Sequence, residues 1–174
     1  KFEDLKKSPS IFISKDGLAS YYQWMIAEFG FTEAQVKPYT FNAQPFLADK
    51  KSVMQGYLSS EPYAIESAAG LKPKVFLLAD YGFNTYSTLI ETRTELVTKN
   101  PDMVKRFVEA SIIGWNNYLY GDNKAANALI KKDNPEMTDD KIAVGIKLMK
   151  EYGIVDSGDT KELGIGAMSD AQMK

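Results

Sequence analysis

Strand-like and helix-like segments alternate along the first part of the sequence, and this alternation restricts the fold more than any other feature. Residues 10–14, 36–41 and 55–59 are short segments that we interpret as strands, because they are apolar or rich in β-forming residues. Each of them is followed by a segment with the signals of a helix. Repeated strand–helix order predicts an α/β fold, in which a mostly parallel sheet carries helices on both faces.

The helix signals in this part are specific. Residues 18–29 place apolar side chains along one continuous helical face, and Gly30 follows where a left-handed C-terminal cap is favoured. The run Ser60–Pro62 predicts the start of another helix, which ends at Gly70. Asn42 stands where it would cap a short helical stretch.

The pattern changes after residues 74–79, which we interpret as a fourth strand. Residues 85–92 are again rich in β-forming residues, and the rest of the chain has helical patterns. The helices that we predict there begin at Asn100-Pro101-Asp102, at Lys124 and at Thr138.

The helix that begins at Asn100 carries a long apolar stripe. The stripe consists of Val104, Phe107, Val108, Trp115, Tyr118 and Leu119. Residues 91–174 encode little sheet on which such a stripe can pack, so we expect its partner sheet to lie outside this sequence. The chain also begins without an initiator Met, and we therefore interpret it as a processed or truncated product. Because Trp115 lies on the helical stripe, we expect it to be a core residue.

The composition excludes several classes of function. The sequence has no cysteine and no histidine, which removes thiol nucleophiles, Cys or His zinc sites and any Ser-His or Cys-His pair. We therefore expect a protein that is not an enzyme and that uses no cofactor or metal. The net charge of −2, with lysines spread among acids, argues against nucleic acid as a partner. No apolar run approaches the roughly 18 residues of a membrane-spanning helix.

Three motifs occur in a characteristic order. Residues 59–63 join a predicted strand end to Glu-Pro, residues 81–90 read Tyr-Gly-Phe-Asn-Thr-Tyr-Ser-Thr-Leu-Ile, and residues 100–110 begin with Asn-Pro-Asp and are followed by Gly114-Trp115. Together they resemble the corresponding elements of solute-binding proteins of the NMT1/THI5-like and SsuA-like group. The resemblance covers most of residues 8–168.

Membership of this group would imply a type II periplasmic-binding-protein-like α/β fold, with two lobes joined by crossover strands. Residues 8–78 would then form one nearly complete second lobe, and residues 79–90 the hinge or crossover segment. Residues 91–174 would form the C-terminal helical part of the first lobe, whose N-terminal part is missing from the sequence.

The resemblance also implies a role in transport. The chain would be the substrate-binding component of an ABC importer, with a small-molecule ligand and a membrane permease as its partners. Its location would be periplasmic or tethered to the cell surface, although no signal sequence is present. Two alternatives remain: a pyrimidine-synthase-like enzyme, which depends on histidine and a cysteine-rich motif, and the effector domain of a transcription regulator.

The candidate ligand-binding residues lie in loops that follow the predicted strands. In open α/β sheets, ligands bind at the carboxyl ends of the strands, beside helix N-termini. Ser14 and Asp16 qualify, although either could cap a helix instead; Asn42 and Gln44 offer amides, or form a turn. Glu61 would accept hydrogen bonds from an aminopyrimidine-like edge, or serve as a favourable charge in the first turn of a helix.

Two tyrosines flank the presumed hinge. Tyr81 or Tyr86 would stack on a flat heterocycle, with inter-lobe packing as the alternative. The only arginines are Arg93 and Arg106, and neither lies in a predicted site loop. Among the ligands that the resemblance implies, we therefore favour a flat heterocyclic nutrient, a thiamine-pyrimidine or riboflavin-like precursor. Lys15 keeps open the alternative of an anion: nitrate, taurine or an alkyl sulfonate.

Overall fold

The computed structural model describes residues 1–173 and divides the chain into two compact units. Unit 1 is Lys1–Asn84 and unit 2 is Thr85–Lys174. The division lies within the segment 79–90 that we expected to connect two lobes.

Unit 1 is built on a small parallel sheet. Its strands are β1 (Ile11–Ile13), β2 (Val36–Pro38) and β3 (Val53–Met54). The order is β2-β1-β3, and Ile11 of the central strand lies opposite Val36 and Val53. Both pairings are parallel, which confirms the predicted sheet type in a mixed α/β structure.

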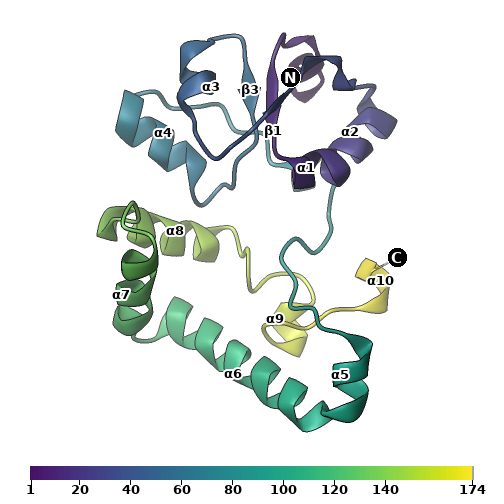
Figure 1. Cartoon of the computed structure of the whole chain (residues 1–174), viewed down its shortest axis with the longest axis vertical. Coiled ribbons are helices and arrows are strands. Elements are labelled where there is room, and N and C mark those ends of the chain that lie inside the picture. The colour runs from purple at the N-terminus through teal and green to yellow at the C-terminus, as the bar shows by residue number, and fades with distance from the viewer. Residues whose placement is uncertain (174) are drawn as a thin grey trace. The chain divides into compact units, whose positions relative to one another are not determined.

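Helices surround this sheet. They are η1 (Phe2–Lys7), α1 (Lys15–Ala19), α2 (Tyr21–Phe29), η2 (Glu33–Gln35), α3 (Gln44–Ala48), α4 (Glu61–Ala69) and η3 (Leu78–Tyr81). Figure 1 shows α1 and α2 on one side of the strands and α3 and α4 on the other. Gly30 and Gly70 end α2 and α4 in the left-handed conformation, as the sequence predicts.

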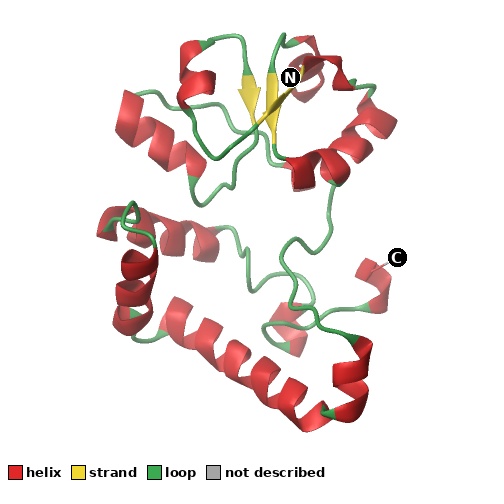
Figure 2. Cartoon of the chain, viewed as in Figure 1, coloured by secondary structure: helices red, strands yellow, loops and turns green. Residues whose placement is uncertain are grey.

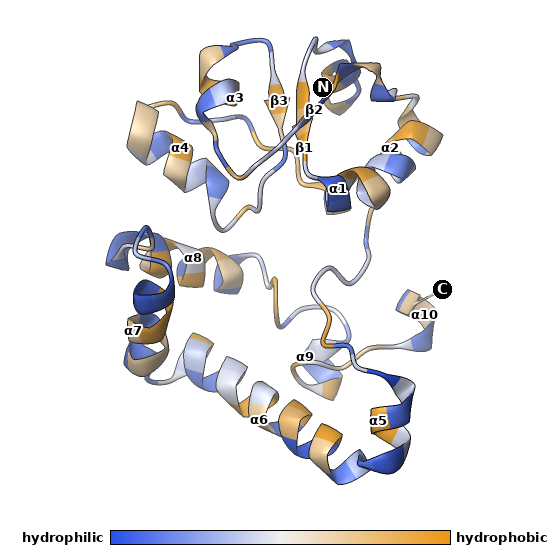
Figure 3. Ribbon diagram, in the orientation of Figure 1, coloured by the Kyte–Doolittle hydropathy of each residue, from blue (hydrophilic) through white to orange (hydrophobic). Residues whose placement is uncertain are grey.

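The core of unit 1 forms where the sheet meets η1 and α2. Its buried side chains are Phe2, Ile11, Ile13, Tyr22, Met25 and Phe31. Strands β1 and β3 are strongly hydrophobic in Figure 3. Tyr22 is fully buried, and its hydroxyl donates a 2.7 Å hydrogen bond to the carbonyl of Thr32. A polar group can therefore lie in this core without an unpaired donor.

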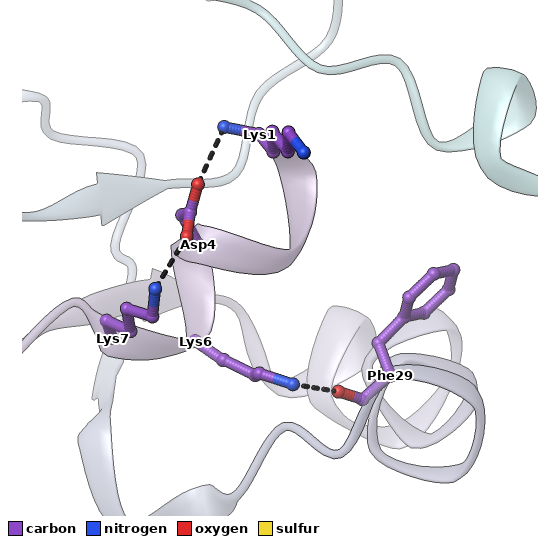
Figure 4. Close-up of polar contacts among 5 residues, drawn as sticks. All are labelled: Lys1, Asp4, Lys6, Lys7 and Phe29. Carbon is purple, nitrogen blue, oxygen red and sulfur yellow. Dashed lines mark hydrogen bonds and ion pairs between the residues drawn. The ribbon is translucent and has the colours of Figure 1, made fainter.

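Ion pairs and a hydrogen bond fix the first turn of the chain (Figure 4). The Asp4 carboxylate pairs with the Lys1 amino terminus at 2.9 Å and with Lys7 Nζ at 2.7 Å. Lys6 Nζ donates to the carbonyl of Phe29 at the end of α2. The hydrogen bond from Lys7, followed by that from the amino terminus, lowers the pKa of Asp4 to about 2. These contacts hold η1 beside α2, where Phe2 enters the core.

Two local predictions for unit 1 are wrong. The single helix predicted over 18–29 is divided at Ser20, which has φ −117° and ψ −103° and whose hydroxyl donates to the carbonyl of Asp16. The third strand is Val53–Met54 and not 55–59, because the chain leaves the ladder after Gln55 N donates to Phe12 O at 2.9 Å. The helix is therefore divided where a local side-chain hydrogen bond forms, and the third strand is displaced because its pairing with β1 ends at Gln55.

The strand predicted over 74–79 is also absent from the described residues, and the β-rich segment 85–92 forms no strand. The first segment runs without strand pairing into η3, although Phe76 and Leu78 pack against the core. The second segment is neither helix nor strand. In the first segment, apolar residues are held by side-chain packing and not by a backbone ladder.

Unit 2 consists of helices joined by loops, without a strand among its described residues, as the red and green ribbon of Figure 2 shows. They are α5 (Thr94–Lys99), α6 (Pro101–Tyr120), α7 (Lys124–Asp133), α8 (Asp139–Glu151), α9 (Thr160–Leu163) and α10 (Asp170–Met173). The predicted start signals are confirmed. Asn100 precedes α6, and Thr138 Oγ1 caps α8 by accepting from Lys141 N at 3.3 Å.

Half of the apolar stripe of α6 is exposed: Phe107, Val108 and Trp115. Among residues 85–173, the buried hydrophobic side chains are Leu119 and Ile142, whereas Phe107 is 60% exposed. The prediction that Trp115 is a core residue is wrong for this structure, since Trp115 is exposed and contacts the Tyr118 ring edge-on at 6.0 Å. Within residues 85–173 the structure has no strand on which the stripe could pack; that its partner sheet lies outside this sequence stays a prediction.

Candidate functional site

The parallel sheet of unit 1 brings three loops to one edge. Because all three strands point the same way, their carboxyl ends share that edge, where ligands bind in open α/β sheets. The loop after β1 begins at Ser14, the loop after β2 spans 39–43, and the loop after β3 spans 55–60. Each leads into a helix, α1, α3 or α4. We call this edge the carboxyl edge.

Gln55 joins the loops after β1 and β3. Its Oε1 accepts hydrogen bonds from Ser14 N at 2.7 Å and from the Tyr21 hydroxyl at 2.9 Å. Gly17 allows this close approach, since a Cβ there would lie 2.5 Å from the Tyr21 hydroxyl oxygen. Burial, and then the charge of Tyr57, raise the pKa of Tyr21 well above its usual range, so its hydroxyl remains a donor.

Glu61 lies at the start of α4 and is fixed through both carboxylate oxygens. Oε2 accepts from Tyr57 N at 2.7 Å, and Oε1 accepts from the Tyr39 hydroxyl at 3.3 Å. Gly56 leaves room for this turn, because a Cβ there would lie 2.9 Å from Glu61 Cβ. The carboxylate is therefore held in one orientation and retains lone pairs for further donors.

Tyr39 is the buried member of this group. Burial, followed by the charge of Glu61 and the hydrogen bond to it, raises the pKa of Tyr39 to about 12. The hydroxyl consequently stays protonated at neutral pH and donates to the Glu61 carboxylate. The pair thus places one negative charge, that of Glu61, at the carboxyl edge, and the neutral Tyr39 hydroxyl donates a hydrogen bond to it.

The other predicted residues of this edge have local partners. Ser14 Oγ accepts from Gly17 N at 3.1 Å and caps α1, in which Asp16 is an exposed first-turn acid. Asn42 Oδ1 accepts from Gln44 N at 2.9 Å, and both residues are exposed. The capping and turn alternatives are therefore realised for Ser14 and Asn42. Their ligand-binding role stays a prediction.

The two predicted aromatic residues belong to different units. In unit 1, the Tyr81 ring stacks on Phe2 with a centroid distance of 4.2 Å and an interplanar angle of 19°. In unit 2, the Tyr86 hydroxyl donates to Asp159 Oδ2 at 2.7 Å and accepts from Ser169 N at 3.0 Å. Hydrogen bonds from Ser169 and then Tyr86 lower the pKa of Asp159. Each tyrosine thus has a structural partner in its own unit.

Three residues of the edge were missed by sequence reasoning. Gln55 and Tyr39 were not recognised because the interpretation placed 55–59 and 36–41 inside strands, although both positions follow the observed strand ends. Phe41 was missed because nothing in a sequence marks a phenylalanine for a left-handed backbone. Its φ is 60°, and no other non-glycine residue in 1–173 has a positive φ. Such a conformation costs about 1–3 kcal/mol.

Two further properties of the described residues bear on function. Within residues 1–173, no three Asp, Glu, His or Cys side chains are grouped so that they could hold a metal ion. None of the helices in the same range combines the length and hydrophobicity that crossing a membrane requires.

In open α/β sheets, ligands bind in the crevice outside the carboxyl ends of the strands, which is where the Glu61 carboxylate is held in unit 1. The family model described as NMT1/THI5 like matches residues 3–125. The chain belongs to this family, that of the SsuA-like ABC solute-binding proteins, and the family indicates a solute-binding or related function. Comparisons with curated proteins and with solved structures gave no match.

Proposed function

We propose that this chain is the substrate-binding component of an ABC importer, and that it captures a small heterocyclic nutrient such as a thiamine-pyrimidine or riboflavin-like precursor. The proposal includes the type II periplasmic-binding fold, a periplasmic or cell-surface location and a permease partner. Family membership supports the transport role. The geometry of the carboxyl edge supports the choice of ligand.

The observation that carries the ligand class is the fixed carboxylate of Glu61. Its two oxygens are oriented by Tyr57 N and the Tyr39 hydroxyl, and an aminopyrimidine presents N–H donors that match such an acceptor. Hydrogen bonds to a charged group contribute roughly 1.5–3 kcal/mol. Because the side chain is already immobilised, little additional ordering opposes binding.

The enzymatic alternative has little chemistry available. A pyrimidine-synthase-like activity would need histidine and a cysteine-rich motif, and the sequence contains neither residue type. We therefore propose binding without catalysis. The regulator alternative would share the fold, and would differ in lacking a permease partner.

The second candidate is an anion such as nitrate, taurine or an alkyl sulfonate. Lys15 favours it, because this residue begins α1 at the carboxyl edge. The two arginines lie in unit 2, and Arg106 shares a shallow depression on α6 with Asp102, Lys105 and Glu109. Two acids and two bases balance there, so the depression is not a strongly cationic site.

Titration calorimetry of the full chain with hydroxymethyl-aminopyrimidine (the pyrimidine half of thiamine) and with taurine tests the proposal. We expect heterocycle binding that Glu61→Gln weakens by about ten- to a hundredfold, since 1.4 kcal/mol is tenfold. Glu66→Gln, an exposed acid on the same helix, is the control and should leave the affinity unchanged. Preference for taurine, or unchanged affinity in Glu61→Gln, would contradict the proposed ligand class.

The roles of Tyr81 and Tyr86 as stacking residues remain part of the proposal. Replacing Tyr86 with Ala should weaken heterocycle binding. Since the Tyr86 hydroxyl also bonds Asp159 and Ser169, Tyr86→Phe is the matched control that keeps the ring and removes those bonds. Weaker binding in Ala but not in Phe would support a stacking role.

A further inference from the structure

Phe41 has a conformation and an exposure that packing alone does not explain. It adopts φ 60°, which glycine or asparagine occupies far more readily, and its side chain is 74% exposed. If this position served only to form a turn, glycine would form the same turn with less backbone strain and would make the chain more stable. The neighbour Asn42 even offers the residue type that such a turn prefers.

The ring of Phe41 packs beside Tyr39, the residue whose hydroxyl bonds the Glu61 carboxylate. It lies 5.3 Å from the Tyr39 ring, and the Tyr39 hydroxyl donates to Glu61 Oε1. Tyr57 donates its backbone N–H to the other carboxylate oxygen, Oε2, and its side chain is 60% exposed. Two exposed aromatic residues, Phe41 and Tyr57, thus belong to the two loops whose residues bond Glu61 at the carboxyl edge.

This combination fits a flat ligand. An exposed aromatic ring offers a face for stacking, and the adjacent carboxylate accepts hydrogen bonds from the edge of the same ligand. An inorganic anion would gain nothing from the ring and would be repelled by Glu61. Both features therefore select a neutral or cationic planar heterocycle with N–H donors.

We propose that Phe41 is a specificity-determining residue whose ring stacks on the heterocycle while Glu61 accepts hydrogen bonds from its edge. This inference rests on the proposed function and adds to it the residue that forms one aromatic wall. The left-handed backbone at Phe41 presents the ring to solvent beside Tyr39 instead of burying it.

Calorimetry of the full chain with hydroxymethyl-aminopyrimidine and with riboflavin tests this inference. We expect Phe41→Ala to weaken binding by about ten- to a hundredfold, as stacking on an aromatic side chain typically contributes. Phe41→Trp, which keeps a stacking surface, should retain affinity to within about threefold, and its fluorescence should be quenched on binding. Leu71→Ala, which removes an apolar side chain that is 48% exposed in the same unit, is the control and should change nothing.

Phe41→Gly separates binding from folding. It should weaken binding as much as Phe41→Ala does, while its melting temperature stays equal to or above that of the wild type, because glycine accepts the left-handed conformation. Wild-type affinity in Phe41→Ala, with the wild type binding the heterocycle, would overturn this inference and leave the proposed function standing. A wild type that binds neither probe would overturn both.

Discussion

Units 1 and 2 bury their apolar side chains to different extents. Unit 1 closes a core around β1, α2 and η1, whereas the long helix α6 of unit 2 leaves half of its apolar stripe exposed. Both units contain well-formed helices with the expected starts. The difference therefore lies in what the helices pack against and not in their propensity to form.

The sheet is the physical reason for this difference. A strand pair offers a continuous apolar face on which an amphipathic helix can bury its stripe, and unit 1 has such a face in Ile11 and Ile13. The described part of unit 2 has no strand. Its helices can cover one another only in part, so each retains exposed apolar area.

The largest expected effect is the loss of a buried ring in unit 1. Phe31 is buried, with its ring 5.9 Å from that of Phe2 and 6.0 Å from that of Tyr22. Phe31→Ala should lower the free energy of unfolding by about 3–5 kcal/mol, because it removes apolar contacts and leaves a cavity. Urea unfolding followed by circular dichroism measures this loss.

A conservative variant guards this prediction against a chain that fails to fold. Phe31→Leu keeps most of the apolar volume and should cost less than about 1.5 kcal/mol. A loss below about 1 kcal/mol in Phe31→Ala would show that unit 1 has no closely packed core.

Two helix caps give a matched pair, one in each unit. Ser14 Oγ accepts from Gly17 N in unit 1, and Thr138 Oγ1 accepts from Lys141 N in unit 2. Replacing either with Ala should cost about 1 kcal/mol, since a cap acts locally whatever the helix packs against. Thermal unfolding of both variants, with Ser14→Thr and Thr138→Ser as controls, measures the two costs. A clear loss in one unit and none in the other would show that capping depends on the core.

The exposed counterpart of Phe31 is Phe107 on α6. Because its side chain is 60% exposed, Phe107→Ala should change the free energy of unfolding by no more than about 0.5 kcal/mol. The same urea experiment as for Phe31→Ala applies. A loss comparable with that of Phe31→Ala would mean that the α6 stripe is buried in solution, and the contrast between the units would disappear.

The smallest effect concerns acid. The pKa of Asp159 lies below its ordinary value of 3.8 in the folded chain, first because of the hydrogen bond from Ser169 and then because of that from Tyr86. Because the pKa is lower in the folded chain than in the unfolded chain, the contact stabilises unit 2 at pH values above the unfolded-state pKa. This stabilisation is lost as the pH falls below about 4. Carboxyl chemical shifts in an NMR titration should show the lowered pKa, and Tyr86→Phe should move it back toward the ordinary value. An unchanged pKa in Tyr86→Phe would exclude the hydroxyl as a cause.

Helix ends were the part of the fold most accessible from sequence. Gly30 and Gly70 adopt the left-handed conformation expected of C-terminal caps, and Thr138 caps α8. These features depend on residues a few positions apart. The strand predicted over 74–79 failed because an apolar run records burial, and side-chain packing of Phe76 and Leu78 satisfies burial without a ladder.

The candidate site was predictable where it depends on strand ends. Ser14, Asn42 and Glu61 all lie in or directly after loops at the carboxyl edge, as the alternation of strands and helices implied. Gln55 and Phe41 required the three-dimensional structure. The hydrogen bonds of Gln55 join residues 34 and 41 positions away in sequence, and the conformation of Phe41 contradicts the preference of its residue type.

Hydrogen–deuterium exchange of the full chain, with and without hydroxymethyl-aminopyrimidine, tests the contrast between the units most directly. Without ligand, we expect amides of β1 and α2 to exchange far more slowly than those of α6, because only the former lie in a closed core. With ligand, added protection should fall on residues 39–44 and 55–61 at the carboxyl edge. Equal protection of β1 and α6, or ligand-induced protection confined to unit 2, would contradict a closed core and a ligand-binding edge in unit 1.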